Sequence, residues 1–190
     1  MPTMLQNAHQ ARFTLHRYAR NMTQAAFPNL WRDLLFHGAP LALLHQGDSL
    51  TDVSGNGNHL VRQVAAGIDF PPWVMSQRGL VLSSNGSSTV GQRLVGTILP
   101  RGDRPLTMMV WLTTRVLSAG KAAFSIGDDV NPAGTVALRL KGGTTEIHAA
   151  AVAGADLVSS GVVPVLNEWY HVAYTFDGVT HKIYINGILT

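Results

Sequence analysis

The sequence predicts an all-β protein, an antiparallel β-sandwich preceded by a short helical N-terminal extension. Charged residues make up 13% of the chain and apolar residues 46%, and the 19 glycines suit a sheet protein with many tight turns. From Gly79 onward, short apolar runs are bounded by glycine, asparagine and aspartate, as strands and turns require. Residues 1–46 hold few glycines and show no alternating apolar pattern, so we expect them to form a separate segment.

The N-terminal extension, residues 1–46, is expected to contain two short helical pieces. Apolar positions recur there at spacings of three and four, and Pro28 would interrupt a single long helix. Its basic residues are Arg12, Arg17, Arg20 and Arg32, and with a single aspartate they account for the whole net charge of +3. We expect these arginines to dock the segment on other proteins of an assembly. The alternative is that the helices pack across one face of the sandwich.

Seven strands are expected after this extension. They cover residues 79–83, 106–113, 122–126, 136–140, 146–152, 168–176 and 181–185. In residues 106–112 neither face of the strand is clearly polar, which predicts a strand covered on both sides.

The last part of the chain predicts a three-stranded meander. Apolar and polar residues alternate over residues 169–176, and the pairs Asp177-Gly178 and Asn186-Gly187 are typical of tight hairpin turns. The third strand has barely begun at Thr190, and an unpaired strand edge is a liability. We therefore expect either a chain that is cut short before a closing strand or a neighbouring chain that completes the sheet.

Four blocks in this order resemble a laminin-G-like domain of the concanavalin A-like lectin and glucanase superfamily. They are DVSGNGNH (52–59), GLVLSSNGSSTV (79–90), PLTMMVWL (105–112) and NEWYHVAYTFDGVTHKIYINGIL (167–189). The resemblance covers residues 47–190 and implies a jelly-roll sandwich of two antiparallel sheets. The chain departs from the family pattern because it ends before the family's closing strand.

The first block is a candidate calcium loop. Asp52, Asn56 and Asn58 place oxygen-bearing side chains at alternate positions of a glycine-rich loop, and calcium prefers oxygen ligands. Related domains often hold calcium there, so the resemblance implies this cofactor. The alternative is that these side chains only bond their own backbone in turns.

The tryptophans are mostly expected in the core. Trp111 and Trp169 lie within predicted strands, where a tryptophan of a sandwich usually packs inside. Trp73 follows Pro71-Pro72 in an irregular stretch, which leaves it as the candidate ligand-binding aromatic.

The residues Gly47-Asp48-Ser49-Leu50 also spell the nucleophile block of the GDSL esterases. A serine hydrolase needs a histidine base, a carboxylate that orients it and donors for the oxyanion. That family places an aspartate three residues before the histidine, whereas Asp177 and His181 are four apart across a predicted turn. The esterase therefore remains a minor alternative.

These features favour a non-enzymatic structural or adhesive protein of a bacteriophage virion, in which the extension docks and the sandwich projects. The partners would be other virion proteins, further copies of the chain and cell-surface glycans. The alternative is a soluble carbohydrate-binding module of a larger secreted protein. Neither nucleic acid nor a membrane is an expected partner, because the chain after the extension is electrically balanced and no apolar run is long enough to span a bilayer.

Overall fold

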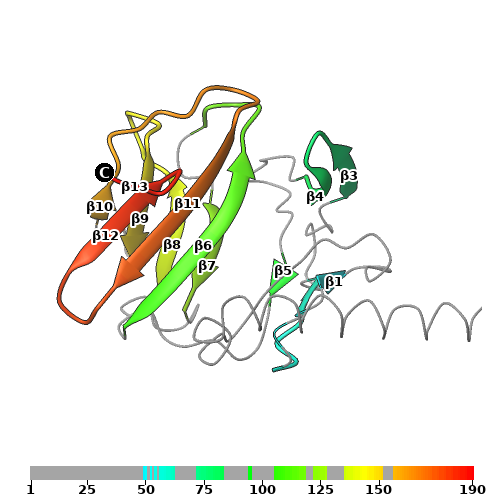
Figure 1. Ribbon diagram of the computed structural model, residues 1–190, viewed down its shortest axis with the longest axis horizontal. Coiled ribbons are helices and arrows are strands. Elements are labelled where there is room, and N and C mark those ends of the chain that lie inside the picture. The colour runs from blue at the N-terminus through cyan, green and yellow to red at the C-terminus, as the bar shows by residue number, and fades with distance from the viewer. Residues whose placement is uncertain are drawn as a thin grey trace, which may run out of the picture. The chain divides into compact units, whose positions relative to one another are not determined.

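A computed structural model describes residues 49–50, 52, 54, 56–62, 72–83, 94–95, 105–118, 122–127, 135–151 and 156–190. These residues form thirteen strands and no helix (Figure 1), which confirms the all-β prediction. It follows that they include no helix that could span a membrane. The predicted N-terminal helices lie outside the described residues.

The chain divides into two compact units, residues 1–98 and 99–190. The first unit contains two small sheets. One is a three-stranded sheet in the order β1-β2-β5, with β1 at Ser49–Leu50, β2 at Leu60–Arg62 and β5 at Leu94–Val95. The other is a hairpin of β3 (Trp73–Ser76) and β4 (Gly79–Leu82).

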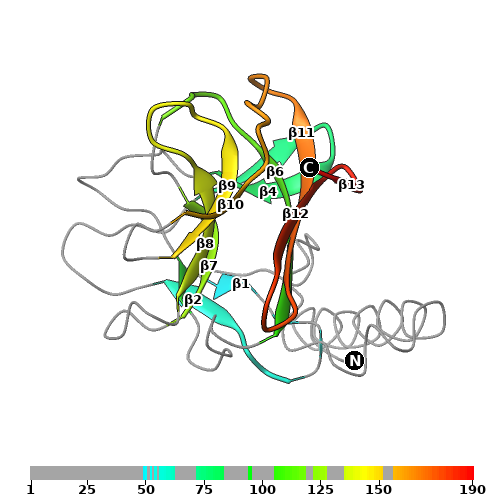
Figure 2. The same cartoon turned by 90° about the vertical axis from the view of Figure 1, so that its left-hand side faces the viewer.

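The second unit is a sandwich of two four-stranded antiparallel sheets. One sheet has the order β13-β12-β11-β6, made of β6 (Leu106–Thr113), β11 (Trp169–Phe176), β12 (His181–Ile185) and β13 (Ile188–Leu189). The other has the order β10-β9-β8-β7, made of β7 (Ala122–Ile126), β8 (Val136–Leu140), β9 (Ile147–Ala151) and β10 (Asp156–Ser159). Figure 2 shows these two sheets nearly edge on, as separate layers.

The apolar core lies between the two layers of the second unit. Successive side chains of a strand point to opposite faces, so every second residue of β11 faces inward, and Tyr170, Val172 and Tyr174 are buried. The inward residues of both sheets form one cluster: Met108, Ile126, Val136, Leu138, Leu140, Ile147, Ala149, Tyr170, Val172, Tyr174, Ile183 and Ile185. This shared core joins the sheets into one sandwich.

Tight turns set the register of the last three strands. The Asp177 carboxylate accepts hydrogen bonds from the backbone N–H groups of Thr180 at 2.7 Å and Val179 at 2.8 Å, which closes the β11–β12 turn and lowers the pKa of Asp177. Asn186 and Gly187 both have positive φ, 52° and 85°, the backbone that a two-residue hairpin turn requires. Both predicted turns are therefore confirmed.

All seven predicted strands are present, each within one residue of its predicted ends. The prediction for residues 106–113 was wrong in one respect, because the outward side chains of β6 are exposed. The prediction also missed five short strands: β1, β2, β3 and β5 of the first unit, and β10, which has a register shift against β9. The jelly-roll strand order stays a prediction.

Candidate functional site

The predicted calcium loop of the first unit is organised by Asp52, which is 1% exposed. Its carboxylate accepts three hydrogen bonds from its own loop. The donors are the Ser54 backbone N–H at 2.8 Å, the Ser54 hydroxyl at 2.8 Å and the Asn58 backbone N–H at 2.9 Å. Because these donors satisfy a buried charge, Asp52 holds the turn in shape.

These contacts favour the turn-forming interpretation over a calcium site. The Asn56 side-chain amide donates to the Ser54 hydroxyl at 3.2 Å, and Asn58 contacts Asp52 through its backbone N–H. Calcium takes about six to eight oxygen ligands, whereas here N–H and O–H donors converge on the carboxylate. In the described part of the chain, no group of three or more His, Asp or Glu side chains could hold a metal ion. Calcium binding stays a prediction.

Of the residues considered for an esterase, Ser49 lies in the same unit, whereas Asp177 and His181 belong to the second unit. Ser49 belongs to β1, where it pairs with Val61 of β2. His59 is close to Asp52, but its Nδ1 accepts the Asp52 backbone N–H at 3.0 Å. This contact involves the backbone of Asp52, so it is not the carboxylate–imidazole contact that orients a catalytic base.

Of the other predicted site residues, Trp73 lies in the described part of the chain. Trp73 is the first residue of β3, where it pairs with Leu82 and is half-buried, so its predicted place in an irregular stretch was wrong. The docking arginines Arg12, Arg17, Arg20 and Arg32 lie outside the described residues.

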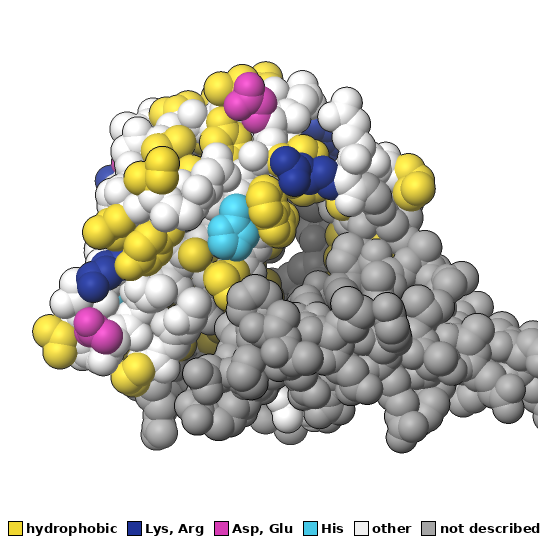
Figure 3. Space-filling model, viewed as in Figure 1, with side chains coloured by type: hydrophobic (Ala, Val, Ile, Leu, Met, Phe, Trp, Pro, Cys, Tyr) yellow, Lys and Arg dark blue, Asp and Glu magenta, His cyan; other side chains and the backbone are white. Residues whose placement is uncertain are grey.

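The candidate site that the structure adds is the side of the β13-β12-β11-β6 sheet that points away from the core, here called the outward face. On β6, β11 and β12 it consists of Thr107, Met109, Trp111, Thr113, Trp169, His171, Ala173, Thr175, Lys182 and Tyr184. Figure 3 shows hydrophobic side chains and a histidine over these strands. Exposed apolar patches on a soluble protein often mark a binding surface.

Trp111 and His171 form an aromatic pair on the outward face. They are direct neighbours on β6 and β11, and their rings lie 5.1 Å apart, tilted by 53°. Trp111 is 53% exposed, and Met109 on the same strand is 49% exposed. The expectation that Trp111 and Trp169 pack in the core was wrong, because both lie on the outward face, where Trp169 is half-buried.

The β12–β13 turn fixes His171 in place. The His171 backbone N–H donates to Oδ1 of Asn186 at 2.9 Å, and the Asn186 backbone N–H donates to the His171 carbonyl at 2.8 Å. Two reciprocal bonds therefore hold this point of β11 against the turn. The outward face is thus presented on a rigid strand, which suits a binding site.

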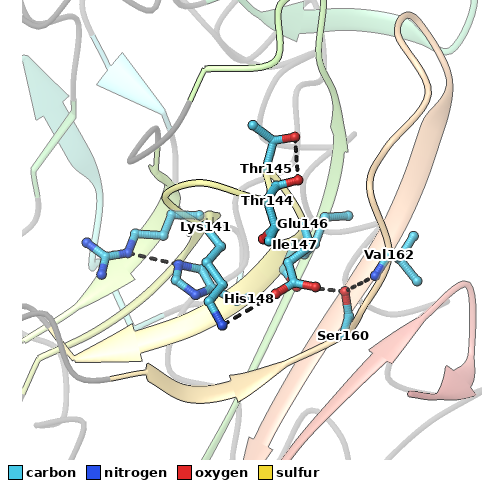
Figure 4. A network of polar contacts seen from close by, with 9 residues as sticks. Lys141, Thr144, Thr145, Glu146, Ile147, His148, Ser160 and Val162 are labelled. Carbon is cyan, nitrogen blue, oxygen red and sulfur yellow. Dashed lines mark hydrogen bonds and ion pairs between the residues drawn. The ribbon is translucent and has the colours of Figure 1, made fainter.

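The other sheet carries a polar network around β8 and β9 (Figure 4). Nε of Arg139 donates to Nε2 of His148 at 3.1 Å, and His148 is 1% exposed. Lys141 pairs with Glu146 at 3.4 Å, and the pKa of Glu146 is lowered by the Ser159 hydroxyl and then by Lys141. These contacts connect β8 with β9, so we infer that their role is structural.

Sequence reasoning missed Trp111 and His171 because it considered β6 alone. The strand looks apolar on both sides, but along its outward side Thr107 and Thr113 flank Met109 and Trp111. A polar border around an apolar centre is the signal that could have identified an exposed face.

The comparison with known families matches a region that includes the whole second unit. A family model described as the concanavalin A-like lectin/glucanases superfamily, Laminin_G_3, matches residues 84–190. Searches of curated proteins and of solved structures found no match. The matched region begins after the Asp52 loop and contains both sheets of the sandwich. The chain therefore belongs to the concanavalin A-like lectin/glucanase superfamily.

Proposed function

We propose that this chain is a non-enzymatic carbohydrate-binding or adhesive module whose ligand contacts the outward face. Membership of a superfamily of lectins and glucanases supports a role in carbohydrate recognition. The observation that carries the proposal is the half-exposed Trp111 beside His171 on a rigid sheet. An aromatic ring can cover the C–H side of a sugar, while an imidazole can bond its hydroxyls.

The chemistry of the outward face supports binding over hydrolysis. Glycoside hydrolases generally use a pair of aspartate or glutamate residues that flank the bond they cleave. The ten residues of the outward face on β6, β11 and β12 include neither. The esterase alternative has its own test, in which a generic ester is offered to the wild type and to Ser49→Ala. Turnover that depends on Ser49 would contradict a non-enzymatic role.

A glycan array followed by calorimetry tests the proposal. The wild-type chain is expected to bind selected glycans, and Trp111→Ala is expected to weaken binding at least tenfold. Val179→Ser is the matched control, because Val179 is an 88% exposed apolar residue at the tip of the β11–β12 hairpin. Equal binding by Trp111→Ala and the wild type would exclude the outward face as the site.

A virion location is a finer form of the same proposal. It depends on the basic segment 1–46, which lies outside the described residues. Deletion of residues 1–40 is its test: the shortened chain should no longer enter an assembly but should keep its glycan binding. If it still enters the assembly, the docking role is refuted while the carbohydrate role stands.

A further inference from the structure

Besides Trp111 and the half-buried Trp169, the outward face carries Tyr184 at a defined position relative to Trp111. His171 of β11 pairs with Trp111 of β6, and the next outward residue of β11, Ala173, pairs with Tyr184 of β12. Trp111 and Tyr184 therefore lie on opposite sides of β11 and one outward row apart. Ile183 and Ile185 are buried in the core, which places Tyr184, between them, on the outward face.

The spacing of these two rings follows from sheet geometry. Strands lie about 4.8 Å apart and rise about 3.4 Å per residue, which gives a separation of about 12 Å between the two Cα atoms. A disaccharide is about as long as this span, whereas a single pyranose ring covers only one of the two aromatic residues. The spacing therefore suits a ligand of at least two sugar units.

The residues between the two rings leave room for such a ligand. Ala173 carries only a methyl group and lies between Met109 on one side and Tyr184 on the other. A sugar chain that crosses from Trp111 to Tyr184 would pass over Ala173 and beside His171. The imidazole is the polar group best placed to bond a hydroxyl near the middle of the ligand.

The charge of the outward face indicates an uncharged ligand. Its residues on β6, β11 and β12 include Lys182 as the only lysine or arginine, and Lys182 interacts electrostatically with Asp177 of the adjoining turn. Recognition of a carboxylate or sulfate generally uses arginine in bidentate geometry, and none of the ten residues is an arginine.

We infer that the outward face binds an uncharged glycan of at least two sugar units, which crosses β11 from Trp111 to Tyr184. This inference rests on the proposed function, because it assumes that the outward face is the glycan site. The two reciprocal bonds between His171 and Asn186 hold the middle of the site in place. Such preorganisation lowers the entropy lost on binding.

An array of neutral and acidic glycans is first probed with the full chain. Calorimetry then compares its affinity for glucose with that for cellobiose, and its affinity for N-acetylglucosamine with that for chitobiose. A neutral disaccharide is expected to bind at least tenfold more tightly than its monosaccharide. Tyr184→Leu should remove most of this difference, and Trp111→Ala should weaken both ligands. Ala173→Leu, which fills the space between Met109 and Tyr184, should weaken only the disaccharide. Val179→Ser should bind as the wild type does, and thermal melting of each variant reports whether it is folded.

The outcomes separate the inference from the proposed function. Equal affinity for the disaccharide and the monosaccharide, or binding of acidic glycans alone, overturns the inference. Loss of that binding in Trp111→Ala would still support the outward face as the site. A folded wild-type chain that binds nothing on the array overturns both.

Discussion

Replacement of Asp52 by asparagine distinguishes a turn-organising carboxylate from a calcium ligand. In the wild type, the Ser54 backbone N–H bonds one oxygen of Asp52, and the Asn58 backbone N–H bonds the other. The asparagine side chain keeps one oxygen and replaces the other with an NH₂ group. One of the two N–H groups must then face a donor, so it loses its acceptor in a buried position.

The size of the effect follows from the strength of hydrogen bonds to charged groups. Such a bond contributes about 1.5–3 kcal/mol, and each 1.4 kcal/mol is a factor of ten. We therefore expect amide hydrogen exchange at Ser54 or Asn58 to become about ten- to a hundredfold faster in Asp52→Asn. Exchange measured by NMR is the suitable assay, because it reports on this loop separately from the sandwich.

Asn56→Ala is the matched control. The Asn56 side chain is exposed and donates to the Ser54 hydroxyl, and none of the three bonds to the Asp52 carboxylate described above comes from it. Exchange in Asn56→Ala should stay within about threefold of the wild type. Unchanged exchange in Asp52→Asn would refute the turn-organising role. If added calcium slows exchange in the wild type but not in Asn56→Ala, the loop is a metal site.

Three further predictions concern the sandwich. Tyr174→Phe removes a buried hydroxyl that is hydrogen-bonded to Nδ1 of His181 at 2.7 Å, and burial raises the pKa of Tyr174 to about 12. Tyr174→Phe should lower the free energy of unfolding by about 1–2 kcal/mol and Tm by a few degrees. An unchanged Tm would contradict this. Asp177→Asn should lower Tm at neutral pH. The folded-state pKa of Asp177 lies below its ordinary value of 3.8, so the carboxylate becomes protonated as the pH falls through the folded-state pKa, and the difference in Tm should then disappear. A difference in Tm that persists in strong acid excludes an ionic origin. Asn186→Ala loses the bond to the His171 backbone and places alanine at a strained positive φ, so it should lower the free energy of unfolding, measured with denaturant, by about 2 kcal/mol. Asn186→Gly loses the same bond without the strain, so it should lower this free energy less.

The strands were predictable because side chains in a strand alternate with a period of two. Tyr170, Val172 and Tyr174 mark one side of β11 in the sequence, and the same three are buried. The turns at Asp177-Gly178 and Asn186-Gly187 were predictable because few residues accept their backbone geometry. Local chemistry determines both features, so a single sequence is enough.

The candidate site was not predictable in the same way. The exposure of Trp111 depends on which strands flank β6 and on what covers them, and Trp111 meets His171 through a pairing distant in the sequence. The hydrogen bonds of Asp52 likewise depend on how its loop closes on itself. In both cases the sequence identified the residue type but not its surroundings.

The pairing of β6 with β11 has a consequence for how the protein is made. All eight residues of β6 pair with β11, which follows about sixty residues later in the chain. At a synthesis rate of about 5–20 residues per second, β6 leaves the ribosome several seconds before its partner. During that interval its aromatic and aliphatic side chains have no sheet to join, so folding of the nascent chain should be slow and should benefit from chaperones that hold exposed strands.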